Sequence, residues 1–155
     1  MRSLVCILFC ILGCTSFRTP ESFAQSSRKQ DFLQLDWPID RARLTQRFIP
    51  HGKSRHAGID LAASKGTPIF SAQAGRVAYT GNGFRGYGNL VIIEHDENWS
   101  SFYSHLNQIL VEEGEWVPKG KTIAAMGRTG RASGNHLHFE LRQKKKPIDP
   151  LENLP

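Results

Sequence analysis

Two short patterns of histidine and aspartate could hold a metal ion. His136 and His138 are separated by one residue, and His56 lies four residues before Asp60. A catalytic zinc site commonly uses three protein ligands, imidazole nitrogen and carboxylate oxygen among them, and keeps a fourth position for water. His56, Asp60 and one histidine of the pair would supply two nitrogens and one oxygen. The residues therefore predict a zinc site, and they leave open which histidine of the pair is the third ligand.

The spacing of the histidine pair suits an extended strand. Side chains alternate between the two faces of a strand, so His136, His138 and Glu140 would share one face. The apolar residues between and after them would face the core: Leu137, Phe139 and Leu141. Glu140 would either orient a ligand or lie at the surface, and we favour the orienting role.

The first pattern also has an even spacing. A local strand puts His56 and Asp60 on one face, where Gly58 between them would leave room for an ion. Ile59 and Leu61 would then point into the core. Two rigid strands would hold the proposed ligands better than a loop would.

A third strand is expected to present His105. Alternation places Ser101 and Tyr103 on the same face as His105, with Phe102 and Leu106 on the other face. A single histidine in a strand is more often a surface or core residue than a ligand. We therefore assign no site role to the remaining histidines, which are His51 and His95.

The elements that must position these residues are predicted to be short strands separated by turns. Glycine and proline punctuate six predicted strands, at residues 68–72, 76–79, 89–95, 101–106, 122–126 and 136–141. One short helical turn is expected within residues 39–48. The predicted fold class is therefore all-β, with an antiparallel sheet or sandwich.

The first residues have the features of an export signal. An uncharged apolar run, residues 4–12, follows Met1 and Arg2 and is too short to span a bilayer of ~30 Å hydrocarbon. Cys14 follows Leu12-Gly13, which resembles a bacterial lipobox, so we expect lipid anchoring through Cys14. The alternative is an ordinary signal peptide cut after Ala24.

This interpretation divides the chain into three parts. They are a signal segment at 1–14, a flexible polar tether at 15–36 and a folded domain at 37–155. All 3 cysteines lie in the signal segment, so a metal in the domain must be held by histidine and carboxylate. The expected location is the cell envelope, facing the periplasm, at the outer rather than the inner membrane.

The chain is basic, with a formal net charge of +6 and a pI near 9.5. Such a charge favours anionic partners. The sequence has no nucleic-acid-binding module and its charges are scattered, so we expect no nucleic acid partner. The one basic run, Lys144-Lys145-Lys146, is interpreted as a solvated hairpin turn.

Several segments, in this order along the chain, resemble the LytM-domain, or lysostaphin-like, zinc metallopeptidases. The resemblance covers about residues 40–154 and is carried by His56-x-x-x-Asp60 within 56–63, Tyr103-Ser104-His105-Leu106, Gly127-Arg128-Thr129-Gly130, the segment 134–140 and Pro147-Ile148-Asp149-Pro150. It implies a β fold of the duplicated hybrid type with a substrate groove. It implies zinc held by His56, Asp60 and His138, with His105 and His136 as catalytic residues that do not bind the metal.

The substrate that this resemblance implies is the peptide part of peptidoglycan, cut at its cross-links by an endopeptidase. Within the family, the glycine-rich stretch 81–89 and Cys14 look most like a lipoprotein branch whose members often activate cell-wall amidases. The alternatives are therefore an amidase activator with little or no hydrolysis of its own, and a D-alanyl carboxypeptidase. Some active relatives carry a tyrosine before the first ligand, near where this chain has Pro50 and His51.

Overall fold

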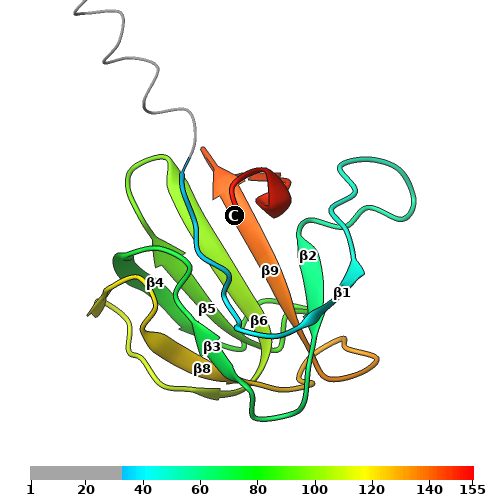
Figure 1. The fold of residues 1–155 in the computed structure, drawn as a ribbon, viewed down its shortest axis with the longest axis horizontal. Helices are drawn as coiled ribbons and strands as arrows, with labels where there is room; N and C mark the ends of the chain where they lie inside the picture. The colour runs from blue at the N-terminus through cyan, green and yellow to red at the C-terminus, as the bar shows by residue number, and fades with distance from the viewer. Residues whose placement is uncertain (1–32) are drawn as a thin grey trace, which may run out of the picture. The chain divides into compact units, whose positions relative to one another are not determined.

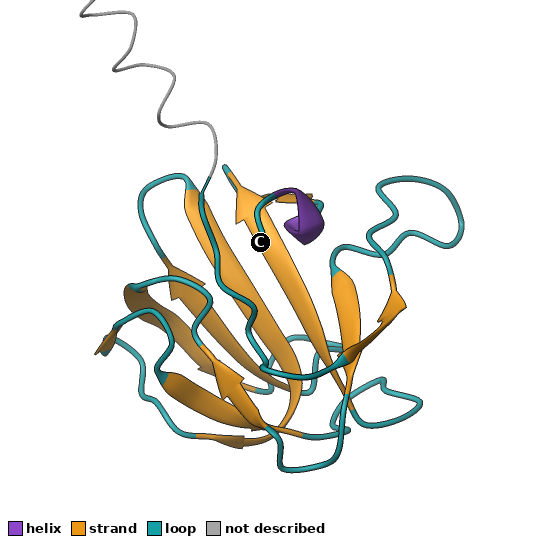
Figure 2. Cartoon of the chain, in the orientation of Figure 1, coloured by secondary structure: helices purple, strands orange, loops and turns teal. Residues whose placement is uncertain are grey.

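The computed structural model describes residues 33–155, which form one antiparallel β sheet (Figures 1 and 2). The elements in chain order are β1 (Arg43–Gln46), β2 (Ile59–Ala62), β3 (Pro68–Phe70), β4 (Gly75–Gly81), β5 (Asn89–Glu94), β6 (Trp99–Ile109), β7 (Trp116–Val117), β8 (Thr122–Met126), β9 (His136–Gln143), β10 (Lys146–Ile148) and the 3₁₀ helix η2 (Pro150–Glu152). The prediction of an all-β fold is confirmed.

The two long strands β6 and β9 lie together near the middle of the sheet. The main strand order is β1-β2-β9-β6-β5-β4-β7, with β10 paired to β9 and β8 paired to both β3 and β6. The register places Asp60 of β2 opposite His138 of β9, and Ser104 of β6 opposite His138 on the other side. Sequence segments that are far apart are thus brought to one place by strand pairing alone.

The main apolar core covers one face of these central strands, and a smaller cluster that includes Phe102 of β6 lies apart from it. Ile59 and Leu61 of β2 lie in the main core, as predicted, and so do the three apolar residues of β9: Leu137, Phe139 and Leu141. Burial of each such side chain contributes roughly 1.5–3 kcal/mol. The opposite face of β2 and β9 is left to the polar residues.

Two expectations about residues 33–48 differ from the structure. The helical turn expected within 39–48 is wrong, because Arg43–Gln46 pairs with β2 as an edge strand instead. Residues 33–36, assigned to the tether, lie against the domain: Leu35 is fully buried and its N–H donates to the carbonyl of Asn153. The predictions for Cys14 and for residues 1–32 lie outside the described residues.

Lys144 and Lys145 of the basic run form the turn between β9 and β10, as predicted, and Lys146 begins β10. Lys144 and Lys145 have φ values of 48° and 67°, and two successive positive φ values suit a tight hairpin turn. No helix among the described residues is long and apolar enough to cross a membrane.

Candidate metal centre

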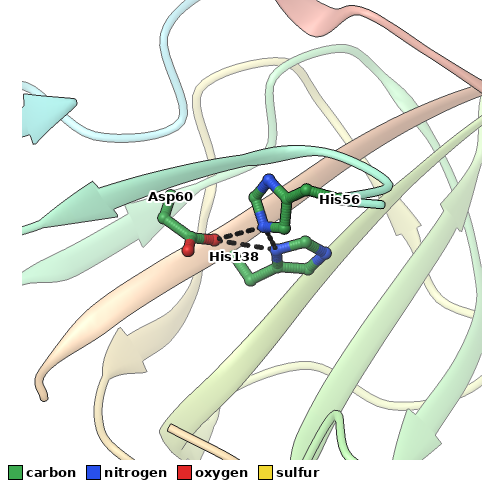
Figure 3. Close-up of side chains that lie close together, drawn as sticks. All are labelled: His56, Asp60 and His138. Carbon is green, nitrogen blue, oxygen red and sulfur yellow. Dashed lines mark hydrogen bonds and ion pairs between the residues drawn. The ribbon is translucent and has the colours of Figure 1, made fainter. Parts of the chain in front are cut away.

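Three side chains from β9, from β2 and from the turn before β2 meet at one point (Figure 3). Nε2 of His56 lies 3.1 Å from Oδ1 of Asp60 and 3.0 Å from Nδ1 of His138. Nδ1 of His138 lies 2.8 Å from the same Asp60 oxygen. Two nitrogens and one oxygen therefore lie within 4.8 Å of one another, so that one ion could contact all three.

The other nitrogen of each imidazole ring is held by a hydrogen-bond acceptor. Nδ1 of His56 donates to the main-chain carbonyl of Arg47 at 2.9 Å, which leaves Nε2 with a lone pair toward the cluster. Nε2 of His138 lies 3.1 Å from Oε1 of Glu140, so Nδ1 of His138 faces the cluster. Acceptors placed behind a ring in this way fix the tautomer that a metal ligand needs.

Gly58 has a different purpose from the one predicted. A Cβ atom at Gly58 would lie 2.1 Å from the main-chain oxygen of Phe139. The absence of a side chain therefore allows the chain before β2 to lie against the backbone of β9. The expected room for an ion is not the reason for this glycine.

The cluster has the electrostatics of a cation site. Burial alone would raise the pKa of Asp60, but hydrogen bonds with His138 and His56 outweigh it and hold that pKa well below its usual range. Burial alone would lower the pKa of His138, whereas its hydrogen bonds to Asp60 and Glu140 raise it to about 9. Both shifts show that this cluster stabilises positive charge beside Asp60, which is the property that a divalent cation would use.

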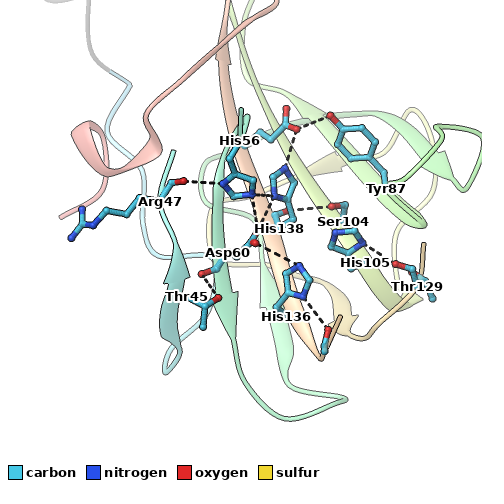
Figure 4. Close-up of polar contacts among 12 residues, drawn as sticks. Thr45, Arg47, His56, Asp60, Tyr87, Ser104, His105, Thr129, His136 and His138 are labelled. Carbon is cyan, nitrogen blue, oxygen red and sulfur yellow. Dashed lines mark hydrogen bonds and ion pairs between the residues drawn. The ribbon is translucent and has the colours of Figure 1, made fainter. Parts of the chain in front are cut away.

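Glu140 is fully buried behind His138, and its carboxylate joins several polar groups. Figure 4 shows two of the residues in these contacts, His138 and Tyr87. Its Oε1 accepts a hydrogen bond from the hydroxyl of Tyr87 at 2.7 Å, and its Oε2 accepts one from Nε of Arg142 at 2.7 Å. Burial and the carboxylate together raise the pKa of Tyr87 to about 12, so its hydroxyl stays a donor. A buried carboxylate is stable only with such partners.

His105 and His136 face each other beside the cluster, with ring centroids 4.7 Å apart. Nδ1 of His105 donates to the carbonyl of Thr129 at 2.8 Å, and Nδ1 of His136 donates to that of Gly134 at 3.0 Å. Nε2 of each ring is thus left as the reactive nitrogen. Burial lowers the pKa of His105, which favours its neutral form.

The predicted face of His105 is wrong. Tyr103 points into the core, whereas His105 lines the same cavity as the cluster. The reason is the backbone of His105, whose φ of 63° interrupts the alternation of β6. A left-handed residue inside a strand is uncommon, and here it turns the His105 side chain toward the cavity.

The five residues predicted for the site all line one cavity of about 610 Å³. The cavity has further polar lining that the sequence did not single out: Gln46, Arg85, Tyr87, Arg131 and Ser133. The two arginines and Tyr87 come from turns, where no side-chain periodicity exists to reveal them. His51 is exposed, and His95 is hydrogen-bonded to Ala74 and Ser101 outside this cavity.

An antiparallel sheet that carries an N,N,O cluster beside two further histidines defines a metallopeptidase type of domain. The chain belongs to Peptidase family M23, whose sequence model matches residues 54–150. The resemblance to LytM-domain proteins is thereby confirmed.

Relatives of this chain include lipoproteins and activators. It is 47% identical over 119 residues to the "Lipoprotein NlpD/LppB homolog" of Pseudomonas aeruginosa, covering 77% of this chain and 39% of the relative. It is 44% identical over 119 residues to the "Murein hydrolase activator NlpD" of Escherichia coli, covering 77% of this chain and 31% of the relative. The chain thus matches less than half the length of these two relatives.

Solved structures of peptidases share the fold. A zinc-containing peptidase from Vibrio cholerae superimposes with a TM-score of 0.72 at 34% identity, covering 80% of this chain and 41% of that one. The catalytic domain of lysostaphin from Staphylococcus simulans gives 0.67 at 26% identity, covering 72% of this chain and 90% of that one. The lysostaphin-like fold predicted from the sequence is confirmed.

Proposed function

We propose that this chain is a zinc-dependent endopeptidase that cleaves the peptide cross-links of peptidoglycan. The observation that carries the proposal is the complete set of five side chains in one cavity: the proposed ligands His56, Asp60 and His138, with His105 and His136 beside them. A protein that only docked to a partner would have no need of two histidines with free Nε2 atoms next to a cation site.

The donor set fits zinc. Two imidazole nitrogens and one carboxylate oxygen form the usual protein part of a catalytic zinc site, and Glu140 behind His138 is the expected supporting carboxylate. When bound, the ion supplies Lewis-acid chemistry, because it polarises a peptide carbonyl and makes water more acidic. The solved Vibrio cholerae peptidase of the same fold is described as zinc-containing, which supports this choice.

The roles of the two further histidines follow from their surroundings. His105, which burial keeps neutral, accepts the proton of the attacking water at Nε2. His136, whose ring lies 4.7 Å away, enters this step as the imidazolium and gives the proton on its Nε2 to the leaving amine. Its Nε2 also lies 3.9 Å from Oδ2 of Asp60, one of the three proposed ligands. Thr129 and Gly134 hold the two rings in place through their carbonyls.

A second function, activation of a cell-wall amidase, is favoured by the relatives. One relative is named a murein hydrolase activator, and 119 residues of this chain match it at 44% identity. The two functions are compatible in one chain, since docking requires a surface and hydrolysis requires the cavity. The resemblance left a third candidate, a D-alanyl carboxypeptidase, which would use the same five residues on a chain end.

The experiment that separates hydrolysis from activation uses dye-labelled cell-wall sacculi. Purified zinc-loaded protein is added with and without a cell-wall amidase. Dye release by the protein alone supports the endopeptidase, and release only in the presence of the amidase supports the activator. The His105→Ala variant distinguishes them again, because it should lose hydrolysis and keep activation.

The proposed location is the periplasmic face of the outer membrane, reached by lipidation of Cys14. Support comes from the lipobox-like sequence and from relatives whose names contain "lipoprotein". Detergent partitioning of the full chain and of Cys14→Ser tests this, because loss of the lipid should move the protein to the aqueous phase.

A further inference from the structure

Two arginines line the cavity that holds the metal cluster, and the mechanism uses neither of them. Arg85 and Arg131 are both exposed to solvent at the cavity. Within residues 33–155, neither guanidinium forms an ion pair with a carboxylate. Arg142 provides the contrast, since its guanidinium is committed to the buried Glu140. Two free guanidinium groups at one cavity are available to a ligand.

The loops that carry these arginines are fixed to each other. The N–H of Arg131 donates to the carbonyl of Gly86 at 2.9 Å. A Cβ at Gly88 would lie 2.4 Å from the carbonyl carbon of Thr129, and one at Gly130 would lie 2.3 Å from N of Gly88. The absence of both side chains lets the two backbones touch. The two arginines are therefore anchored on loops of defined geometry.

The charge of the cavity favours an anion. Among the described residues that line it, Asp60 is the one carboxylate, and that carboxylate is held by His56 and His138. A guanidinium binds a carboxylate through two parallel hydrogen bonds, which gives direction as well as attraction. Neighbouring positive charges in a cleft also raise the local concentration of anionic ligands.

We propose that Arg85 and Arg131 form a binding site for a carboxylate of the stem peptide, next to the bond that is cut. This inference rests on the proposed function, since it names the class of substrate as peptides with a free carboxylate near the scissile bond. The carboxylate has two possible sources: the C-terminus of the stem peptide, or a side-chain carboxylate within it. The arginines are specificity-determining residues and take no part in proton transfer.

Binding of a synthetic cross-linked stem-peptide dimer tests the proposal without requiring cleavage. Zinc-loaded full chain with His105→Ala is used throughout, and the dissociation constant is measured by calorimetry. Three peptides are compared: the free form, a form amidated at its C-termini and a form amidated at its side-chain carboxylates. Arg85→Gln and Arg131→Gln are added singly and together, with zinc content measured for each.

Arg128→Gln is the matched control. Arg128 is exposed and belongs to the same loop as Arg131, but it does not line the cavity. We expect each cavity variant to weaken binding of the free peptide severalfold and the pair together about tenfold, with Arg128→Gln unchanged. Amidation of the carboxylate that the arginines bind should weaken binding of the peptide to protein that keeps both arginines. The same amidation should not change binding of the peptide to the double variant. This outcome also identifies the source of the carboxylate.

Three results would overturn the inference. One is equal binding of free and amidated peptides by the protein with both arginines. Another is an equal loss in the Arg128→Gln control. The third is a double variant that binds stem peptide normally but loses binding to an acidic segment of an amidase, which would assign the pair to a protein partner. Failure of the chain to hydrolyse cell wall, with carboxylate discrimination intact, would remove the endopeptidase proposal and leave the binding site.

Discussion

Nε2 of His138 lies 3.1 Å from Oε1 of the fully buried Glu140, on the opposite side of the ring from the cluster. The carboxylate therefore determines which nitrogen of His138 faces Asp60. In Glu140→Gln we expect zinc affinity to fall about 10–100-fold, because the supporting charge is lost. Competition with a chromogenic chelator measures this. Glu97→Gln, at an exposed carboxylate, is the control, and equal affinity in all three proteins would contradict the positioning role.

Substitutions should distinguish the proposed ligands from the proposed catalytic histidines by their effects on zinc content and on activity. His138→Ala should lose zinc and hydrolysis together, whereas His105→Ala should keep zinc and lose activity by about 10²–10⁴-fold. Metal analysis on the same samples used for the rate measurement checks both. His51→Ala, at an exposed histidine outside the cavity, should retain zinc and activity. Loss of zinc from His105→Ala would place that residue among the ligands.

Gly58 should be one of the least tolerant positions of the domain. In Gly58→Ala the new Cβ would lie 2.1 Å from the Phe139 carbonyl oxygen, so the chain just before β2 must move away from β9. We expect the free energy of unfolding to fall by about 2 kcal/mol or more, measured by chemical denaturation. Gly134→Ala is the control, since nothing lies within 4 Å of its Cβ position. Equal stability of the two variants would show that the backbone at Gly58 does not lie this close to Phe139 of β9.

His95 should make the fold less stable in mild acid. Burial lowers its pKa below the usual 6.5, so its neutral form is favoured in the folded protein. As the pH falls below about 6.5 the unfolded chain binds a proton that the folded chain resists, and stability decreases. Denaturation at pH values of about 7.5 and 5.5 should show a smaller decrease for His95→Gln than for the natural protein. An equal decrease would mean that His95 does not contribute.

Local patterns in the sequence predicted much of this site, because strand alternation is a local property. The even spacing of His136 with His138 puts both on one face of β9, whereas His56 lies in the turn before β2 and not in the local strand expected for it. The pairing of β2 with β9, which sets Asp60 opposite His138, is a contact between distant segments that no local pattern predicted; only the joint ligand set was implied, by the family resemblance.

The features that the sequence did not predict depend on contacts between distant parts of the fold. The left-handed backbone of His105 depends on its neighbours in the fold, and no pattern in 101–106 signals it. The edge strand β1 has exposed or half-buried residues, so it lacks an apolar pattern. Arg85 and Arg131 lie in glycine-rich turns, whose approach to each other depends on contacts between Gly88 and Gly130.

The central claim is that the cavity around His138 hydrolyses peptide cross-links. Its most direct test is incubation of purified cross-linked muropeptide dimers with the zinc-loaded protein alone, followed by mass identification of the products. The proposal predicts conversion of dimers to monomers by wild-type protein and none by His138→Ala. Intact dimers after incubation with wild-type protein that holds one zinc ion per chain would contradict it.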